Sequence, residues 1–202
     1  MKVELIKVGM FQTNCYLVYN DSEMLVIDPG ASFKKIDEAI KRHENVKVLA
    51  ILLTHGHFDH IGAVDKLKNK YNCPIIASKE DKKILRNEKY NNLAGFASQV
   101  ESQIDWIEKD ELKFGSIDVK VLFTPGHSAG SVMYIIDGKL FSGDTLFRLS
   151  VGRTDLYSGN SYQLMESLQQ LYSLDRNMIV YPGHEASTTV GFELDHNPYI
   201  QK

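Results

Sequence analysis

The stretch THGHFDH, residues 54–60, directly follows the apolar run KVLAILL, residues 47–53. Consecutive apolar residues are typical of a strand that is covered on both faces. Three histidines and an aspartate therefore stand where a buried strand ends, at a sheet edge that gives a site a rigid base. Imidazole nitrogens and carboxylate oxygens suit zinc, iron or manganese. The stretch therefore predicts a metal site at the end of this strand.

Spacing divides the polar side chains of this stretch into two groups. His55 and His57 are two residues apart, so a short extended segment projects both toward one face. Asp59 and His60 follow where the chain must turn into a helix, and they can point to a second position nearby. The stretch alone thus offers ligands for two cations.

Three further polar residues also stand at strand ends. His127 follows the run VLFTPG, His184 follows MIVYPG, and Asp144 follows KLFSG, whose glycine lets the backbone come close. We interpret the whole set as a centre for two divalent cations, zinc first, with iron or manganese as alternatives. The ligands would be His55, His57 and His127 for one cation, Asp59, His60 and His184 for the other, and Asp144 between them.

The other histidines and the cysteines have more ordinary interpretations. His43 and His196 stand alone, and we expect each to be a cap or a hydrogen-bonded core residue. Cys15 and Cys73 cannot form a disulfide framework, so we expect reduced, partly buried thiols. A structural zinc site, which is closed and usually rich in thiolates, is disfavoured because the motifs contain no cysteine.

Length and composition favour a single domain over residues 1–202. The net charge of −3 gives no basic field for nucleic acid. No apolar run approaches the ~18 residues of a membrane span, and the N-terminus lacks the apolar core of a signal peptide. We therefore expect a cytoplasmic protein with no nucleic-acid or membrane partner. The oligomeric state stays open.

Apolar periodicity predicts alternating strands and helices. Ser32 can cap a helix over residues 33–43, and a second helix follows the histidine cluster over residues 61–71. A third helix has Leu164, Leu168 and Leu171 on one face. The polar stretch 79–110 shows no single period, and we interpret it as an excursion of short helices with a solvated surface. The expected strands are residues 3–9, 14–19, 23–30, 47–53, 74–78, 117–125, 131–137, 139–144 and 178–182.

Four motifs occur in order along the chain. They are T-H-x-H-x-D-H from Thr54, T-P-G-H ending at His127, S-G-D-T around Asp144, and P-G-H ending at His184. With them the chain resembles the metallo-β-lactamase fold superfamily over nearly its whole length. The resemblance implies an α/β protein, a four-layer αββα sandwich. Two mixed β-sheets would face each other, with helices outside and metals at one sheet edge.

The ligand set and the segment 144–159 resemble, within this superfamily, the compact glyoxalase II-like proteins, a hydroxyacylglutathione hydrolase-like branch. This resemblance implies a dinuclear hydrolase of a small-molecule thioester such as an S-acylglutathione, with Arg153 as a substrate-binding residue. Two features depart from that family. The chain ends soon after His184, without the helical extension of full-length glyoxalase II, and Glu185 stands where compact relatives often have glycine.

Metal-assisted hydrolysis fits these ligands. Two cations lower the pKa of a water toward ~7 and stabilise a developing oxyanion, and we expect Asp59 to act in catalysis by orienting that water. A thiolate leaves without strong acid help because thiols have a pKa of about 8.5, which favours a thioester over an amide. A serine triad is not supported, since the chain has no GxSxG sequence.

Alternative activities stay open at this point. A persulfide dioxygenase of the same superfamily would hold one iron on His55, His127 and Asp144, and such enzymes share a segment like Gly152–Asp155. Lactone hydrolysis is a further alternative. A secreted β-lactamase is disfavoured because the N-terminus does not look like a signal peptide.

Arg153 and three aromatic residues each have two interpretations. Arg153 either contacts an anionic group of the substrate or forms a salt bridge with Asp155. Phe147, Tyr157 and Tyr162 either line the pocket or pack in the core, and we favour the core.

Overall fold

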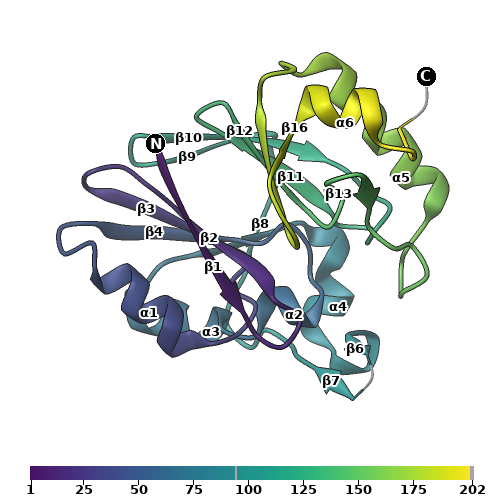
Figure 1. Ribbon diagram of the computed structural model, residues 1–202. Helices are drawn as coiled ribbons and strands as arrows, with labels where there is room; N and C mark the ends of the chain where they lie inside the picture. Colours follow the sequence, from purple (N-terminus) through teal and green to yellow (C-terminus); the bar gives the residue numbers. More distant parts are fainter. Residues whose placement is uncertain (94, 201–202) are drawn as a thin grey trace.

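Two six-stranded β-sheets lie face to face in the computed structural model, which describes residues 1–93 and 95–200. Helices cover the outer face of each sheet, two on the N-terminal half and two on the C-terminal half (Figure 1). These helices are α1 (Phe33–Lys41) and α3 (Val64–Tyr71), then α5 (Ser161–Leu168) and α6 (Val190–His196). The predicted αββα sandwich of the α/β class is confirmed.

The first sheet is mixed and comes from the N-terminal half. Its strand order is β1-β2-β3-β4-β5-β8, antiparallel from β1 to β3 and parallel from β3 to β8. The strands are β1 (Lys2–Val8), β2 (Thr13–Tyr19), β3 (Glu23–Ile27), β4 (Lys47–Leu52), β5 (Ile75–Ala77) and β8 (Asp105–Trp106). Strand β4 is the apolar run that precedes the histidine stretch.

The second sheet is also mixed, with the order β16-β15-β12-β11-β10-β9. Strands β12 and β15 pair in parallel, and the other neighbours pair antiparallel. Strands β10, β12 and β15 therefore run in one direction and end at the same edge. The strands are β9 (Glu111–Phe114), β10 (Ile117–Phe123), β11 (Val132–Ile136), β12 (Lys139–Gly143), β15 (Ile179–Pro182) and β16 (Thr188–Thr189).

Three apolar layers hold these four structural layers together. One lies between α1, α3 and the first sheet, one between the two sheets, and one between the second sheet and α5. Tyr134 and Phe141 are fully buried between the sheets. Leu164, Leu168 and Leu171 are buried as predicted; the third lies in the 3-10 helix η3 (Gln169–Ser173) that follows α5. Among the described residues, no helix is both long and apolar enough to cross a membrane.

The two predicted N-terminal helices differ from expectation in detail. The first ends at Lys41, and Ser32 does not cap it: its Oγ accepts a hydrogen bond from the Gly9 amide at 3.2 Å. The second is divided into α2 (Phe58–Ile61) and α3. The chain breaks at Gly62 because its amide donates to the Gly30 carbonyl at 2.9 Å. A side chain at Gly62 would lie 2.4 Å from that oxygen, so only glycine allows this close approach.

The polar stretch 79–110 is more deeply packed than we predicted. Its short helices are present, but Asp81, Leu85, Val100 and Ile104 are buried, so a solvated surface describes only part of it. The elements are η1 (Lys79–Asp81), α4 (Lys82–Arg86), η2 (Glu88–Tyr90), β6 (Asn92–Leu93) and β7 (Phe96–Ala97). A second small hairpin, β13 (Leu146–Phe147) and β14 (Ser150–Val151), follows Asp144.

Candidate metal centre

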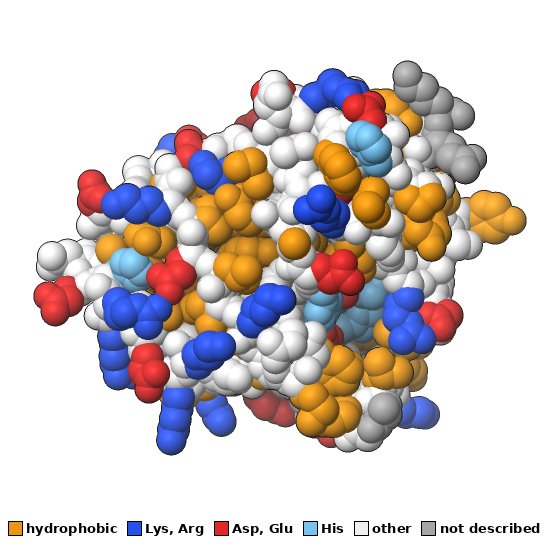
Figure 2. All heavy atoms as spheres, in the orientation of Figure 1, with side chains coloured by type: hydrophobic (Ala, Val, Ile, Leu, Met, Phe, Trp, Pro, Cys, Tyr) orange, Lys and Arg blue, Asp and Glu red, His pale blue; other side chains and the backbone are white. Residues whose placement is uncertain are grey.

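The predicted ligands gather where strands of both sheets end. The loop after β4 and helix α2 carry the four from the first half, and the ends of β10, β12 and β15 carry the three from the second. Figure 2 shows histidine atoms reaching the surface between the two halves, with hydrophobic side chains directly below them. Both sheets are therefore needed to build the site.

The first group consists of His55, His57 and His127, all buried. The Nδ1 atom of His57 lies 2.8 Å from Nε2 of His127. The His55 ring centroid lies 4.8 Å from that of His57 and 4.7 Å from that of His127. Three imidazole nitrogens thus converge on one point.

The second group consists of Asp59, His60 and His184. Oδ2 of Asp59 lies 3.2 Å from Nε2 of His184 and 3.6 Å from Nε2 of His60. Asp144 lies between the groups, because its Oδ1 is 3.3 Å from Nε2 of His60 and its Oδ2 is 3.6 Å from Nε2 of His127. The structure therefore brings all seven predicted side chains together.

Hydrogen bonds behind the rings fix their orientation. The buried carboxylate of Asp28 lies 3.0 Å from Nδ1 of His60 and accepts a hydrogen bond from Oγ1 of Thr54 at 2.6 Å. Because that hydroxyl proton points to Asp28, the Thr54 oxygen can accept from Nδ1 of His55, 3.1 Å away. Carboxylate and hydroxyl partners of this kind orient metal-binding histidines. We therefore interpret Asp28 as the residue that orients His60 and not as a metal ligand, although its carboxylate also lies close to His55.

Backbone carbonyls play the same role for the histidines of the second half. Nδ1 of His127 lies 2.7 Å from the Arg153 carbonyl, and Nδ1 of His184 lies 3.2 Å from that of Phe11. His55, His60, His127 and His184 thus all present Nε2 to the centre. His57 presents Nδ1 instead.

The ligand atoms fit divalent cations. Within the part of the chain that the structure describes, four buried polar atoms of the site lack a hydrogen-bond partner: Nε2 of His55, His57 and His60, and Oδ1 of Asp144. Unpartnered buried polar atoms are costly. Three of these atoms, Nε2 of His55, Nε2 of His60 and Oδ1 of Asp144, face the centre, where bound cations would satisfy them. Such a set of nitrogen and carboxylate donors suits zinc, iron or manganese.

The sequence profile of the metallo-beta-lactamase superfamily matches residues 8–184. The chain belongs to this superfamily. It is 40% identical to the probable metallo-hydrolase YqgX of Bacillus subtilis, over 99% of this chain and 98% of the relative. It is 34% identical to the hydroxyacylglutathione hydrolase GloC of Haemophilus influenzae, over 99% and 98% of the two chains.

Two crystal structures agree with this assignment over almost the whole fold. BLEG-1, a B3 metallo-beta-lactamase, is 38% identical with a TM-score of 0.94, and the match covers 100% of both chains. TTHA1623 in a di-iron-bound form is 34% identical with a TM-score of 0.87, covering 98% of this chain and 100% of the other. The protein is thus a metallo-hydrolase superfamily member with a histidine and aspartate cluster suited to divalent metal.

Burial and neighbouring charges set the protonation of this metallo-β-lactamase-type site. Burial lowers the pKa of His55 well below its usual value and that of His57 to about 3, with the neighbouring rings adding to the effect. Both are therefore neutral at neutral pH, the form that binds metal. Burial also opposes charge on His60, but the carboxylates of Asp144, Asp59 and Asp28 raise its pKa well above the usual value.

Two supporting carboxylates of this metallo-β-lactamase site were missed by the sequence analysis. Asp28 follows β3 in a DPG turn, so the strand-end signal that marked the ligands could have found it. Asp81 accepts hydrogen bonds from Gly56 N at 2.8 Å, Ser128 Oγ at 2.7 Å and Gly130 N at 2.6 Å. It thereby joins the two loops that carry the first group, and no local pattern marks it.

Arg153 forms a salt bridge with Asp155, which is one of the two roles that we considered for it. Its Nε and Nη2 donate to the carboxylate of Asp155 at 2.6 and 2.8 Å. Contact with substrate stays a prediction. Tyr162 is 84% exposed, so core packing is wrong for it, and Tyr157 lies at the surface against Tyr90. Phe147 meets the His184 ring edge-on at 6.1 Å.

The residues that we placed outside the site lie outside it. His43 is within hydrogen-bond distance of Glu4, and Nδ1 of His196 lies 3.0 Å from a carbonyl of its own helix. Cys15 and Cys73 are free and buried.

Proposed function

We propose that this protein is a dinuclear metal-dependent hydrolase of thioesters, of the hydroxyacylglutathione hydrolase type. The observation that carries the proposal is the pair of ligand groups with Asp144 in reach of a ring from each. One cation would be held by His55, His57 and His127, the other by Asp59, His60 and His184, and both by Asp144. Zinc is our first choice, and the similarity to a di-iron protein makes iron a close alternative.

The residues around the centre suit hydrolysis. Two bound cations would supply a water of lowered pKa and positive charge for a developing oxyanion. Thr13 Oγ1 donates to Oδ2 of Asp59 at 2.9 Å, and this fixed orientation supports the catalytic role that we propose for Asp59. Asp59 would orient the attacking water toward the carbonyl carbon. The thiolate then leaves without an acid, as its low pKa allows.

The thiol carrier would extend toward the loop after β14 and the segment around η2. A cavity of about 160 Å³ there is lined in part by His57, Lys89, Asn92 and Tyr157. Arg153 lines a separate cavity beside Gly152 and Thr154. Its side chain is half exposed, and its surface pair with Asp155 is worth little, so an anionic group of a long carrier can compete for it. Glutathione, with two carboxylates, fits such a path, and the similarity to GloC supports it.

A second candidate function is β-lactam hydrolysis. It is favoured by the similarity to the B3 metallo-beta-lactamase BLEG-1 over the whole chain. The same cations and water would attack a lactam carbonyl. An amine, however, leaves less readily than a thiolate, so we rank this activity second.

The test measures three activities on one preparation. We expect thiol release from S-lactoylglutathione and other glutathione thioesters, slower cleavage of a chromogenic cephalosporin, and no oxygen uptake with glutathione persulfide. Oxygen uptake without thiol release would overturn the proposal in favour of a persulfide dioxygenase.

Two variants test whether the second cation matters. His60→Ala and His184→Ala should each lower thioester turnover by about 100-fold or more, or ~2.7 kcal/mol of transition-state stabilisation. His196→Ala is the matched control, because its ring is outside the site and it should retain full turnover. If His60→Ala and His184→Ala retained the full turnover of the control variant, the result would contradict a two-metal hydrolase.

A further inference from the structure

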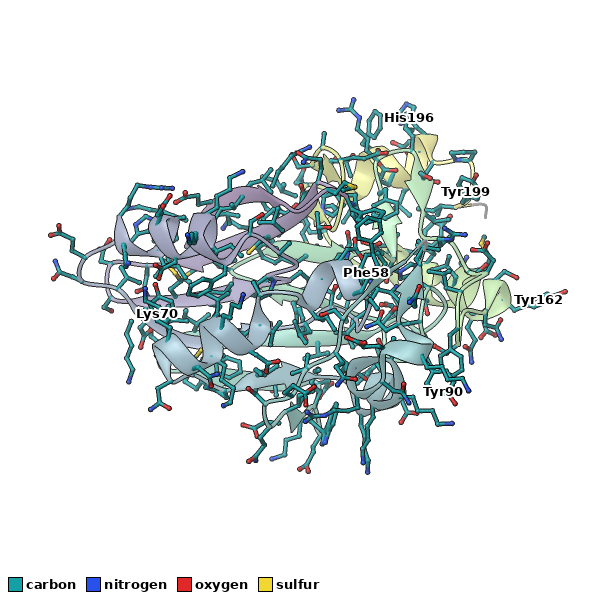
Figure 3. The ribbon with its side chains drawn as sticks, turned by 90° about the horizontal axis from the view of Figure 1, so that it is seen from below. Phe58, Lys70, Tyr90, Tyr162, His196 and Tyr199 are labelled. Carbon is teal, nitrogen blue, oxygen red and sulfur yellow. The ribbon has the colours of Figure 1, made fainter. Side chains whose placement is uncertain are left out.

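A second, apolar cavity adjoins the metal centre. It has a volume of about 320 Å³ and lies between the β1–β2 turn, helix α2 and strand β7. Three aromatic rings form its walls: the ring centroid of Phe11 lies 5.2 Å from that of Phe58 and 5.4 Å from that of Phe96. Phe58 projects from α2 near the middle of the face seen in Figure 3. We call Phe11, Phe58 and Phe96 the aromatic cluster.

The cavity is directly connected to the reacting centre. Asp59, the proposed catalytic carboxylate, lines it together with its hydrogen-bond partner Thr13. Phe58 stands between two proposed ligands in the sequence, and the Phe11 carbonyl orients His184. A chain that fills the cavity could therefore belong to a substrate whose carbonyl group lies at the metal centre.

The lining of the cavity excludes a charged group. Asp59 is its one ionisable residue, and Thr13 and Ser98 add its only hydroxyls among the described lining residues. The rest of the lining consists of apolar residues and glycines: Val8, Gly9, Met10, Phe11, Gly30, Ala31, Phe58, Gly62, Phe96 and Ala97. A carboxylate of glutathione would find no cation here, whereas Lys89 lines the smaller cavity on the other side of Phe58.

Two members of the aromatic cluster are exposed beside a third apolar side chain. Phe11 is 38% exposed and Phe96 is 40% exposed, and Met10 beside them is 75% exposed. Contiguous exposed apolar side chains often mark a binding site. Phe96 comes from the β6–β7 hairpin, so the excursion over residues 79–110 supplies one wall of the cavity.

We propose that this cavity receives the acyl group of the thioester, and that the preferred acyl group is an unbranched apolar chain rather than the hydroxylated lactoyl group. The inference rests on the proposed thioesterase function. It places the two arms of the substrate on opposite sides of Phe58. The apolar acyl arm lies against the aromatic cluster and the polar thiol arm lies toward Lys89.

The test uses thioesters that differ only in the acyl group. Acetyl, lactoyl and hexanoyl thioesters of N-acetylcysteamine, an uncharged thiol, are compared by kcat/KM for thiol release. An added methylene in an apolar pocket changes specificity by roughly tenfold or more, so we expect hexanoyl to exceed acetyl by at least about tenfold. Lactoyl should stay close to acetyl.

A variant of the cluster should remove this preference. Phe96→Ala should lower the hexanoyl-to-acetyl ratio about tenfold, because one wall is lost, and Phe96→Leu should keep most of it. Phe123→Ala is the matched control, since Phe123 is a similarly exposed phenylalanine on β10 that does not line the cavity. It should leave the ratio unchanged.

Three results would overturn the inference. Equal kcat/KM for acetyl and hexanoyl, with thiol released from both, would leave the thioesterase standing and refute the acyl cavity. A Phe96→Ala effect that follows the length of the thiol, in a second series with varied thiols, would assign the cavity to the other arm. No thiol release from any thioester would refute the proposed function and the inference together.

Discussion

Asp144 is the residue on which the two ligand groups depend together. One of its oxygens lies near His60 of the second group, and the other lies near His127 of the first. The backbone of Gly183 lies close to this carboxylate: a Cβ atom at position 183 would lie 2.1 Å from Oδ1 of Asp144, so a larger residue there would displace it. The carboxylate thus lies between the rings of both groups, and position 183 must stay small to leave room for it.

Replacement of Asp144 should affect both cations, whereas replacement of His184 should affect one. We expect Asp144→Ala to lose both metals and His184→Ala to lose mainly one, because only the former contacts rings of both groups. Elemental analysis of the purified variants measures this directly. Two metals per chain in Asp144→Ala would show that it does not bridge.

At the scale of elements, a buried carboxylate with partly exposed lysine partners joins α1 to α3. Asp37 of α1 accepts hydrogen bonds from the Tyr71 hydroxyl at 2.6 Å and lies 2.8 and 2.5 Å from the ammonium groups of Lys41 and Lys70. Burial alone would raise the pKa of Asp37, but these three donors lower it well below its usual value. The ionised carboxylate therefore stabilises the packing of the two helices.

The cluster predicts a pH-dependent stability. A lowered folded-state pKa stabilises the protein above the unfolded-state value of ~3.9, and the effect fades as the pH falls toward the folded-state pKa. Asp37→Asn should lower the free energy of unfolding at pH 7 by about 1–3 kcal/mol, and the difference from wild type should shrink below pH ~4. Urea unfolding at several pH values measures it. Glu38→Gln is the control: at an exposed position on the same helix, it should change the free energy of unfolding by less than ~0.5 kcal/mol. If the difference in this free energy between Asp37→Asn and wild type stayed constant down to pH 2, the mechanism would be refuted.

The strand ends and the clustering of the polar side chains beyond them could be predicted because each signal is local. An apolar run marks a buried strand, and His55, His127 and His184 follow such runs after one to three intervening residues. The supporting role of Asp81 could not be predicted, because its three donors come from segments far away in the sequence. The break at Gly62 likewise depends on contact with Gly30, which no helical period reveals.

At the scale of the molecule, each ligand group joins the two halves of the sandwich. His55 and His57 come from the first half and His127 from the second, and the second group is divided in the same way. The candidate site thus lies where β4 of the first sheet ends next to β10, β12 and β15 of the second, and it connects the two halves of the fold. The β1–β2 turn and the 79–110 excursion then add the apolar cavity to this edge.

The most direct test of the central claim is a metal titration of thioester turnover. Metal-free protein receives Zn²⁺ in steps, or Fe²⁺ without oxygen, and thiol release from a glutathione thioester is measured at each step. The two ligand groups predict that turnover is negligible without metal and rises until two cations per chain are bound. Full turnover at one cation per chain, or turnover that does not depend on metal, would contradict a dinuclear hydrolase.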